Sequence, residues 1–303
     1  MDDIEENFGH LINPPNLPNW LVNIHNSFHV HFIGANRLHS VGRVLNDYMD
    51  DFKGALTPAV LINSQELKRE IERKLAAFAR VSQELERTFP NRLINRMLSF
   101  NEEIVPSESE IIERLSRLEE RRLSLAKVSL LDSARDTSMN VPLGETINPS
   151  RRLDVHTRNV LELYIEDTEG KLEELVSMES RLNLFVNILN KRLVSSRKKV
   201  FVDKEKGYCI LLPNGGEIPL ENLSSGEQHE IVMLYELLFR TTTGSLVVID
   251  EPELSLHITW QQKFLEDVLE IAKITGLKML IATHSPDIIS NRWDLTVPLG
   301  EEI

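Results

Sequence analysis

Two short apolar runs, separated by a helical pattern, constrain the fold of this chain more than any other feature. Leu246–Asp250 is rich in β-branched residues, and Glu251 follows it directly. Lys278–Ala282 repeats the pattern, and the polar His284 follows shortly after. Such runs indicate buried strands, and the helical pattern between them, which stops at Gly276, predicts a β-α-β unit with parallel strands. The acids and the histidine are therefore expected at one edge of a sheet, where open α/β sheets bind ligands.

The two acids at the end of the first run, Asp250 and Glu251, suit phosphate chemistry. At the exposed end of a buried strand, the first carboxylate can hold Mg²⁺ and the second can orient a water molecule. Ahead of them, Leu223–Gln228 is predicted to form a serine- and glycine-bearing loop that opens a helix. Helix N-termini present backbone N–H groups and the positive end of the helix dipole, so they suit phosphate. The alternative for the two acids is a pair that caps a following helix.

In this order and spacing, the motifs resemble the second half of an ABC-type ATPase head of the SMC, RecF and OLD-like AAA_21 group. The resemblance is strongest to Septu- and retron-associated defence ATPases, and it covers about residues 196–303. Leu223–Gln228 matches the signature loop, and Val247–Glu251 matches the Walker B strand. Leu254–His257 stands at the D-loop position, and His284 stands at the position of the switch histidine.

In that family ATP lies between two heads, so the resemblance implies a homodimer or a higher oligomer. It also implies that Asp250 binds Mg²⁺, mostly through water, that Glu251 polarises the attacking water, and that His284 contacts the γ-phosphate. Ser255 and His257 are expected at the seam of the dimer. The loop residues that are expected to contact ATP are Ser224, Ser225, Gly226, Glu227 and Gln228.

The sequence departs from the ABC pattern in three places. Ser225 stands where many ABC proteins have glycine, and His257 stands where they have aspartate; both variants are typical of the OLD and Septu branch. The third departure is the absence of a Walker A motif, G-x-x-x-x-G-K-[ST], which cradles the phosphates of the nucleotide. The only Gly-Lys pair, Gly170-Lys171, falls in a helical stretch without the preceding glycine.

Three explanations for the absent Walker A motif are open. The chain is the C-terminal part of a longer ATPase, or one half of a split ATPase whose partner supplies the motif, or a degenerate head that no longer hydrolyses ATP. In each case we expect little ATPase activity from this polypeptide alone. The function hypotheses are accordingly an ATPase head that works in phage defence with a separate HNH-type nuclease, a non-hydrolysing interaction scaffold, and a RecF- or SMC-like DNA repair ATPase.

The predicted fold class is α/β: an incomplete ABC-ATPase head, with a parallel β-sheet and flanking helices, interrupted by an α-helical arm. We predict a remnant of the first ATPase lobe in residues 1–60, the arm in residues 61–195 and the second lobe in residues 196–303. Glycine nearly disappears in the predicted arm, where Gly144 and Gly170 are the only examples between residues 64 and 195. The alternative to an arm is a helical bundle that packs only on itself.

The helices of the predicted arm follow from periodicity and capping signals. Ser64 is expected to cap the first helix, with breaks at Pro90 and Pro106. Ser107–Glu110 matches the capping-box spacing ahead of a second helix, and a return helix is expected from 153 to 195. The apolar residues that share a face of the first and return helices are Leu67, Ile71, Leu75, Phe78, Leu172, Leu175, Leu182, Phe185, Leu189 and Leu193.

Composition limits the compartment and the partners. The single cysteine, Cys209, lies in an apolar strand-like run and is predicted to be a packed core thiol. One cysteine allows no intramolecular disulfide, and no apolar run approaches the ~20 residues that cross a bilayer, so a cytoplasmic protein without a membrane partner is expected. The net charge of −13 argues against a globally basic nucleic-acid binder. Local arginine clusters are interleaved with glutamate, which favours a solvated face and leaves DNA contact as the alternative.

Overall fold

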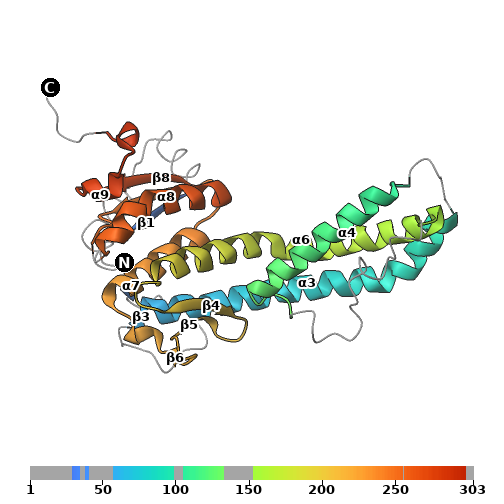
Figure 1. The fold of residues 1–303 in the computed structure, drawn as a ribbon, viewed down its shortest axis with the longest axis horizontal. Helices are drawn as coiled ribbons and strands as arrows, with labels where there is room; N and C mark the ends of the chain where they lie inside the picture. The colour runs from blue at the N-terminus through green and yellow to red at the C-terminus, as the bar shows by residue number, and fades with distance from the viewer. Residues whose placement is uncertain are drawn as a thin grey trace, which may run out of the picture. The chain divides into compact units, whose positions relative to one another are not determined.

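A computed structural model describes residues 29–34, 38–40, 57–98, 105–132, 153–254 and 256–297 (Figure 1). The chain forms two compact units, and the division falls within one helix. The sheet unit contains residues 1–37 and 233–303, and the arm unit contains residues 38–232. Most of the predicted first-lobe remnant, the tip of the predicted arm and Ser255 lie outside the described residues.

The sheet unit contains the predicted β-α-β unit. Strands β7 (Leu246–Asp250) and β8 (Lys278–Ala282) are parallel neighbours, and α8 (Ile258–Thr275) connects them. Strand β1 (Val30–Ile33) pairs in parallel with the other side of β7, so the order is β1-β7-β8. The parallel pairing and the connecting helix confirm the prediction. The chain continues into the short helices α9 (Pro286–Ile289) and η5 (Trp293–Leu295).

The end of α8 follows the predicted stop signal. Gly276 adopts a left-handed conformation with φ of 70°, and its N–H donates to the carbonyl of Ala272. Glycine takes this conformation without the steric cost that a side chain adds. The turn returns the chain directly into β8.

The two faces of this sheet differ in burial. Val247 and Ile249 of β7 are fully buried. Phe32, Val248 and Leu280 form a row across the strands on the opposite face, and Phe32 and Leu280 are 63% and 60% exposed. Parallel sheets are normally covered on both faces. One apolar face of this sheet therefore remains accessible in the part of the chain that the structure describes.

Among the described residues, three long helices form most of the arm unit: α3 (Ala59–Leu98), α4 (Glu108–Lys127) and α6 (Val155–Arg192). The 40 residues of α3 extend over about 60 Å at 1.5 Å per residue. α6 packs against both α3 and α4 (Figure 1). The predicted apolar stripe on α6, from Leu172 to Leu193, is buried at all six positions. Long helices therefore fill the described part of residues 61–195, as the predicted fold class requires, and the bounds of the arm remain a prediction.

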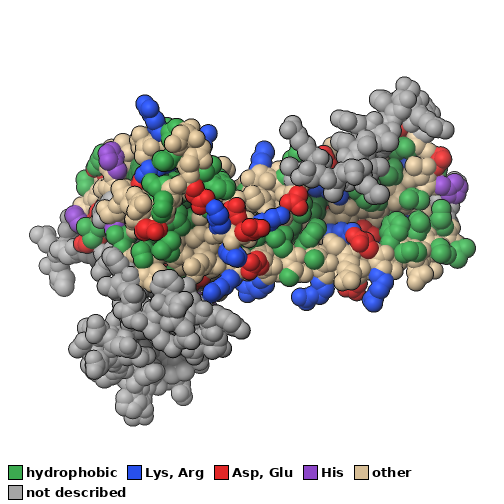
Figure 2. All heavy atoms as spheres, turned by 90° about the horizontal axis from the view of Figure 1, so that it is seen from below, with side chains coloured by type: hydrophobic (Ala, Val, Ile, Leu, Met, Phe, Trp, Pro, Cys, Tyr) green, Lys and Arg blue, Asp and Glu red, His purple; other side chains and the backbone are tan. Residues whose placement is uncertain are grey.

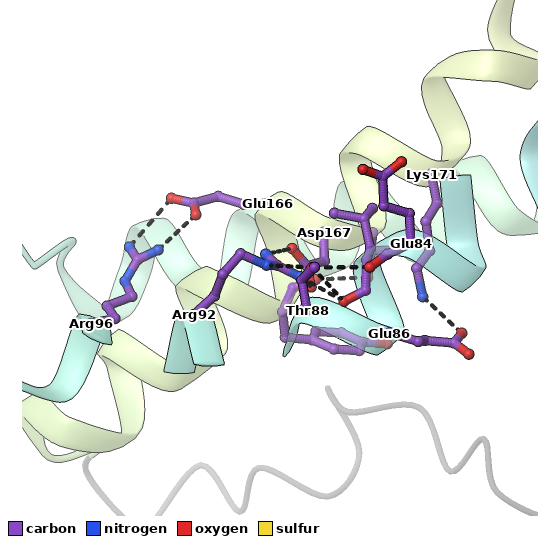
Figure 3. Close-up of polar contacts among 11 residues, drawn as sticks. Glu84, Glu86, Thr88, Arg92, Arg96, Glu166, Asp167 and Lys171 are labelled. Atoms are coloured by element: carbon purple, nitrogen blue, oxygen red, sulfur yellow. Dashed lines mark hydrogen bonds and ion pairs between the residues drawn. The ribbon is translucent and has the colours of Figure 1, made fainter. Parts of the chain in front are cut away.

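Ion pairs join α3 to α6 in antiparallel order (Figure 3). Arg92 binds Asp167, and Arg96 Nη1 donates to Glu166 Oε2 at 2.6 Å. Lys171 Nζ, further along α6, donates to Glu86 Oε1 at 3.2 Å. As the residue number rises along α3, the residue number of the partner on α6 falls. Such contacts fix the register of the two long helices, and the more exposed pair, Lys171 with Glu86, should contribute about 1 kcal/mol or less.

Two predictions about α3 were wrong. Ser64 does not cap the helix, which begins at Ala59; its hydroxyl instead donates to Lys206 and Tyr208 carbonyls and accepts from the Tyr208 N–H. Pro90 lies inside α3 and does not end it. Packing against α6 holds the helix together on both sides of the proline, which outweighs the loss of one backbone hydrogen bond. The capping prediction for α4 is confirmed, since Ser107 Oγ accepts from the Glu110 N–H.

At the base of α6 the chain forms a small antiparallel sheet. It consists of β4 (Lys199–Asp203), β5 (Gly207–Leu211) and β6 (Glu217–Ile218), in that order. A second pair, β2 (His39–Ser40) with β3 (Thr57–Pro58), precedes α3. The turn η3 (Leu220–Asn222) then leads into α7 (Ser225–Tyr235) and the π-helical turn η4 (Glu236–Arg240).

The thiol of Cys209 on β5 should be unreactive in the folded protein. The residue is buried, and burial, together with a hydrogen bond to Glu217, raises the pKa of Cys209 to about 12. Because the thiolate is the reactive form, alkylation at neutral pH should be very slow until the chain unfolds. Thiol titration with and without denaturant measures this directly, since the chain has no other cysteine. Full reaction of the native protein would contradict the buried placement.

Acidic partners surround the predicted arginine clusters. Arg114 pairs with Glu169 at 2.7 Å, and Arg121 Nε lies 3.9 Å from Glu179 Oε2. Figure 2 shows basic and acidic side chains interleaved on the face that it presents. This pairing favours the solvated-face interpretation, and DNA contact remains a prediction. Among the described residues, no helix is both long enough and apolar enough to span a membrane.

Candidate functional site

The two predicted acids lie at the carboxyl edge of the β1-β7-β8 sheet. Asp250 is the last residue of β7 and pairs with Ala282 at the end of β8. Glu251 follows with φ of 44°, a left-handed conformation that is uncommon for a residue with a side chain. Its N–H donates to the Ala282 carbonyl at 2.9 Å, which holds this conformation in place. Backbone strain of this kind concentrates at functional sites.

His284 lies at the same edge, as predicted. Its Nδ1 is 3.8 Å from Glu251 Oε1, and its side chain is 73% exposed. The sheet therefore brings Asp250, Glu251 and His284 together from two neighbouring strands. The parallel β-α-β topology brings these residues together, although 32 residues separate Glu251 from His284 in the sequence.

A third acid, Glu253, was not predicted as a site residue. Its side chain is 6% exposed, and Oε1 lies 3.1 Å from Nδ1 of His284. Oε2 accepts a hydrogen bond from Thr283 Oγ1 at 2.8 Å, and Oε1 accepts from the His284 N–H at 3.2 Å. The available signal was the sequence Asp-Glu-Pro-Glu, whose last acid stands two residues beyond the pair.

The segment at the D-loop position has a local structural role. His257 caps α8, since Nδ1 accepts from the Thr259 N–H. Gln261, one turn into α8, donates to the Leu256 carbonyl at 3.0 Å, and its Oε1 accepts from Ser285 Oγ at 2.9 Å. Gln261 thus joins the turn after β7 to the turn after β8. Ser255 lies outside the described residues, so its placement at a dimer seam remains a prediction, as does that of His257.

The predicted signature loop belongs to the arm unit and forms a capping box at the start of α7. Ser224 Oγ accepts from the Glu227 N–H at 3.3 Å, and Glu227 Oε2 accepts from the Ser224 N–H at 3.0 Å. Gln228 Nε2 donates to the Leu223 carbonyl at 3.0 Å. Ser224 and Ser225 are exposed, and Gly226 is half-buried. The loop therefore presents its two serines, while Glu227 and Gln228 hold its backbone.

Lys198, which stands between Arg197 and Lys199 in the sequence, supports this loop. Lys198 Nζ donates to both carboxylate oxygens of Glu227, at 2.9 and 2.7 Å, and both side chains are largely buried. Burial alone would raise the pKa of Glu227, but the hydrogen bonds from Lys198 and from the Ser224 N–H hold it below its ordinary value. The carboxylate of Glu227 is thus ionised and fully engaged within the arm unit.

The residues at the sheet edge supply only some of the ligands that a bound Mg²⁺ ion needs. The described residues contain no group of three or more metal-ligating side chains. Mg²⁺ is commonly held by one or two carboxylates, with water and phosphate oxygens completing its shell. Asp250 at the strand end supplies a carboxylate of this kind, which matches the donor set of a nucleotide-dependent Mg²⁺ site.

Comparison with known families decides the classification. A family described as "AAA domain, putative AbiEii toxin, Type IV TA system" (AAA_21) matches residues 40–290, which is most of the chain. The chain belongs to the AAA_21 family. This classification agrees with the predicted resemblance to an ABC-type ATPase group.

Curated relatives match a part of this AAA_21 chain. UvrABC system protein A of Clostridium acetobutylicum is 30% identical over 149 residues, which cover 48% of this chain and 15% of that protein. The retron Vc95 probable ATPase of Vibrio cholerae is 23% identical over 179 residues, which cover 49% of this chain and 34% of that protein. UvrABC system protein A of Bacillus subtilis is 31% identical over 127 residues, or 42% of this chain. The chain spans about a third or less of the length of these relatives.

Proposed function

We propose that this chain is the part of an ABC-type ATPase head that carries the signature loop, the Walker B acids and the switch histidine, and that it works in phage defence. The observation that carries the proposal is the meeting of Asp250, the strained Glu251 and His284 at one sheet edge. The AAA_21 classification supplies the ATPase type. The similarity to the retron Vc95 probable ATPase supports the defence context, in which a separate HNH-type nuclease is the proposed effector.

The site residues divide the work of ATP hydrolysis by role. Asp250 would hold Mg²⁺, and that ion would neutralise charge on the phosphates. Glu251 would accept a hydrogen bond from the attacking water and orient it in line with the γ-phosphate. His284 would contact the γ-phosphate from the neighbouring strand. Ser224 and Gly226 of a second copy would close over the same phosphate, because the capped start of α7 presents backbone N–H groups to an anion.

The proposal requires a Walker A segment that this sequence does not contain. The accessible apolar row on the sheet, Phe32, Val248 and Leu280, supports a further covering element. A helix that follows a phosphate-binding loop has the apolar face that such a surface needs. ATP binding would then depend on a segment upstream in the same protein or on a partner subunit.

Phosphate release tests the proposal. The chain alone should release phosphate from ATP no faster than buffer. Addition of a polypeptide that supplies the Walker A motif, from the same gene or from a partner, should produce Mg²⁺-dependent turnover of about 1 s⁻¹ or more, within the usual range of enzymes. Asp250→Asn in the same mixture should abolish the Mg²⁺-dependent turnover. If the mixture associates and folds but releases no phosphate, the chain is the non-hydrolysing scaffold that the sequence also allows.

The similarity to UvrABC system protein A favours a second candidate, the RecF- or SMC-like ATPase. It shows that relatives of this chain are not confined to retron-associated proteins. Addition of DNA to the completed ATPase distinguishes the two candidates. Turnover that rises with duplex DNA in the absence of a nuclease partner favours the DNA-repair type, and turnover that is indifferent to DNA favours the defence type.

A further inference from the structure

The carboxylate of Glu253 is buried, so protein groups must replace the hydrogen bonds that water would make to it. Transfer of a charged group from water into a protein interior is costly unless hydrogen bonds and charges replace the water. Three groups of one segment lie against its carboxylate: the Thr283 hydroxyl, the His284 N–H and the His284 ring. Glu253 therefore joins the turn after β7 to the turn after β8, and we call this set of contacts the clasp.

The contact places one nitrogen of His284 beside the acid, since Nδ1 lies 3.1 Å from Glu253 Oε1. A carboxylate oxygen accepts hydrogen bonds, so this position favours the tautomer that carries its proton on Nδ1. Nδ1 of His284 lies 3.1 Å from Glu253 and 3.8 Å from Glu251, so Glu253 is the nearer acid. The second nitrogen, Nε2, then remains for a ligand. Which nitrogen of a histidine is protonated is set by the partner of the other nitrogen.

We propose that Glu253 is the positioning residue for His284: it holds the ring through Nδ1 and so presents Nε2 to the γ-phosphate. This inference rests on the proposed function, and Glu253 itself does not touch the nucleotide. When both nitrogens are protonated, Nε2–H donates to the phosphate while Nδ1–H stays with Glu253. Without the clasp, the ring of this exposed histidine would rotate among several orientations.

Imidazole ¹⁵N spectra of the full chain, labelled at histidine, test the proposal without nucleotide. His284→Asn identifies the resonances of His284 among those of the nine histidines. The neutral ring should carry its proton on Nδ1, and Glu253→Ala should shift it toward the Nε2–H form that an unconstrained histidine favours. Glu266→Ala is the matched control, because this acid is exposed on α8 and pairs with Lys263. An Nε2–H ring in the wild type overturns the proposal, whether or not any variant folds.

Turnover of the completed ATPase supplies the functional half of the test. Glu253→Gln keeps one acceptor oxygen for the clasp, so it should fold, and it should lower kcat by about tenfold with KM for ATP unchanged, as expected for a misoriented group. An unchanged kcat overturns the positioning role even if the ring is on Nδ1. Absence of turnover in the wild type overturns the proposed function alone, because the spectra are recorded without ATP.

Discussion

Replacement of Lys198 by methionine should lower the free energy of unfolding of the arm unit by about 3 kcal/mol, the usual cost of removing one partner from a buried ion pair. Methionine fills a similar volume but leaves the Glu227 carboxylate buried with its Ser224 N–H and Ser196 hydroxyl partners only. Lys198 follows Arg197, which has a left-handed φ of 56° in the turn between α6 and β4. The pair therefore ties the base of the arm to the signature loop.

Urea unfolding followed by far-UV circular dichroism measures this loss, since the long helices α3, α4 and α6 all belong to the arm unit. The matched control is Lys206→Met. Lys206 pairs with Glu217 at the same 2.7 Å, but both side chains are about half exposed, so the loss of stability should be much smaller than for Lys198→Met. Equal losses in the two variants would show that burial of the Lys198 pair contributes nothing.

The same pair predicts a dependence of stability on pH. Because the pKa of Glu227 is lowered in the folded state, its contribution is fully present above the unfolded value of about 4.3. It is lost as the pH falls from there through the folded pKa. The stability difference between the wild type and Glu227→Gln should therefore be largest at neutral pH and shrink below about pH 5. A difference that grows in acid would contradict the ionised, buried placement of Glu227.

The sheet edge could be predicted from the sequence because its geometry follows from short-range patterns. Two apolar runs of strand length with a helical stretch between them allow essentially one arrangement, with both carboxyl ends at the same edge. Asp250, Glu251 and His284 were placed by that rule. The strained φ of Glu251 was not predicted, because it arises from the hydrogen bond to Ala282 on a different strand.

The supporting residues could not be predicted, because their roles depend on contacts between distant segments. Glu253 and Lys198 both stand among other charged residues, and sequence alone assigns such residues to solvent. The capping prediction for Ser64 was wrong for the same reason. A serine before an apolar stripe is a typical helix cap, but here its hydroxyl bonds to the backbone of Tyr208, 144 residues away. Pro90 signals a break that packing of α3 against α6 overrides.

Replacement of Glu251 by glutamine should lower ATP turnover of the completed head by about a hundredfold or more, the range expected for loss of a general base. Glutamine keeps the size of the side chain and leaves the backbone hydrogen bond to Ala282 intact, so the turn after β7 should persist. It removes the carboxylate charge that would take the proton of the attacking water. The side chain of Glu251 is 43% exposed, so the change should cost little stability.

The variant should keep the steps that precede hydrolysis, and this separates chemistry from binding. Asp250 would still hold Mg²⁺, and Ser224 and Gly226 would still close over the γ-phosphate, so ATP should drive association of Glu251→Gln heads into a dimer that persists. Sedimentation with ATP and with ADP measures this, with Glu266→Gln as the exposed control on α8. Turnover within about threefold of the wild type would remove Glu251 from the role of base, because loss of a true base costs far more.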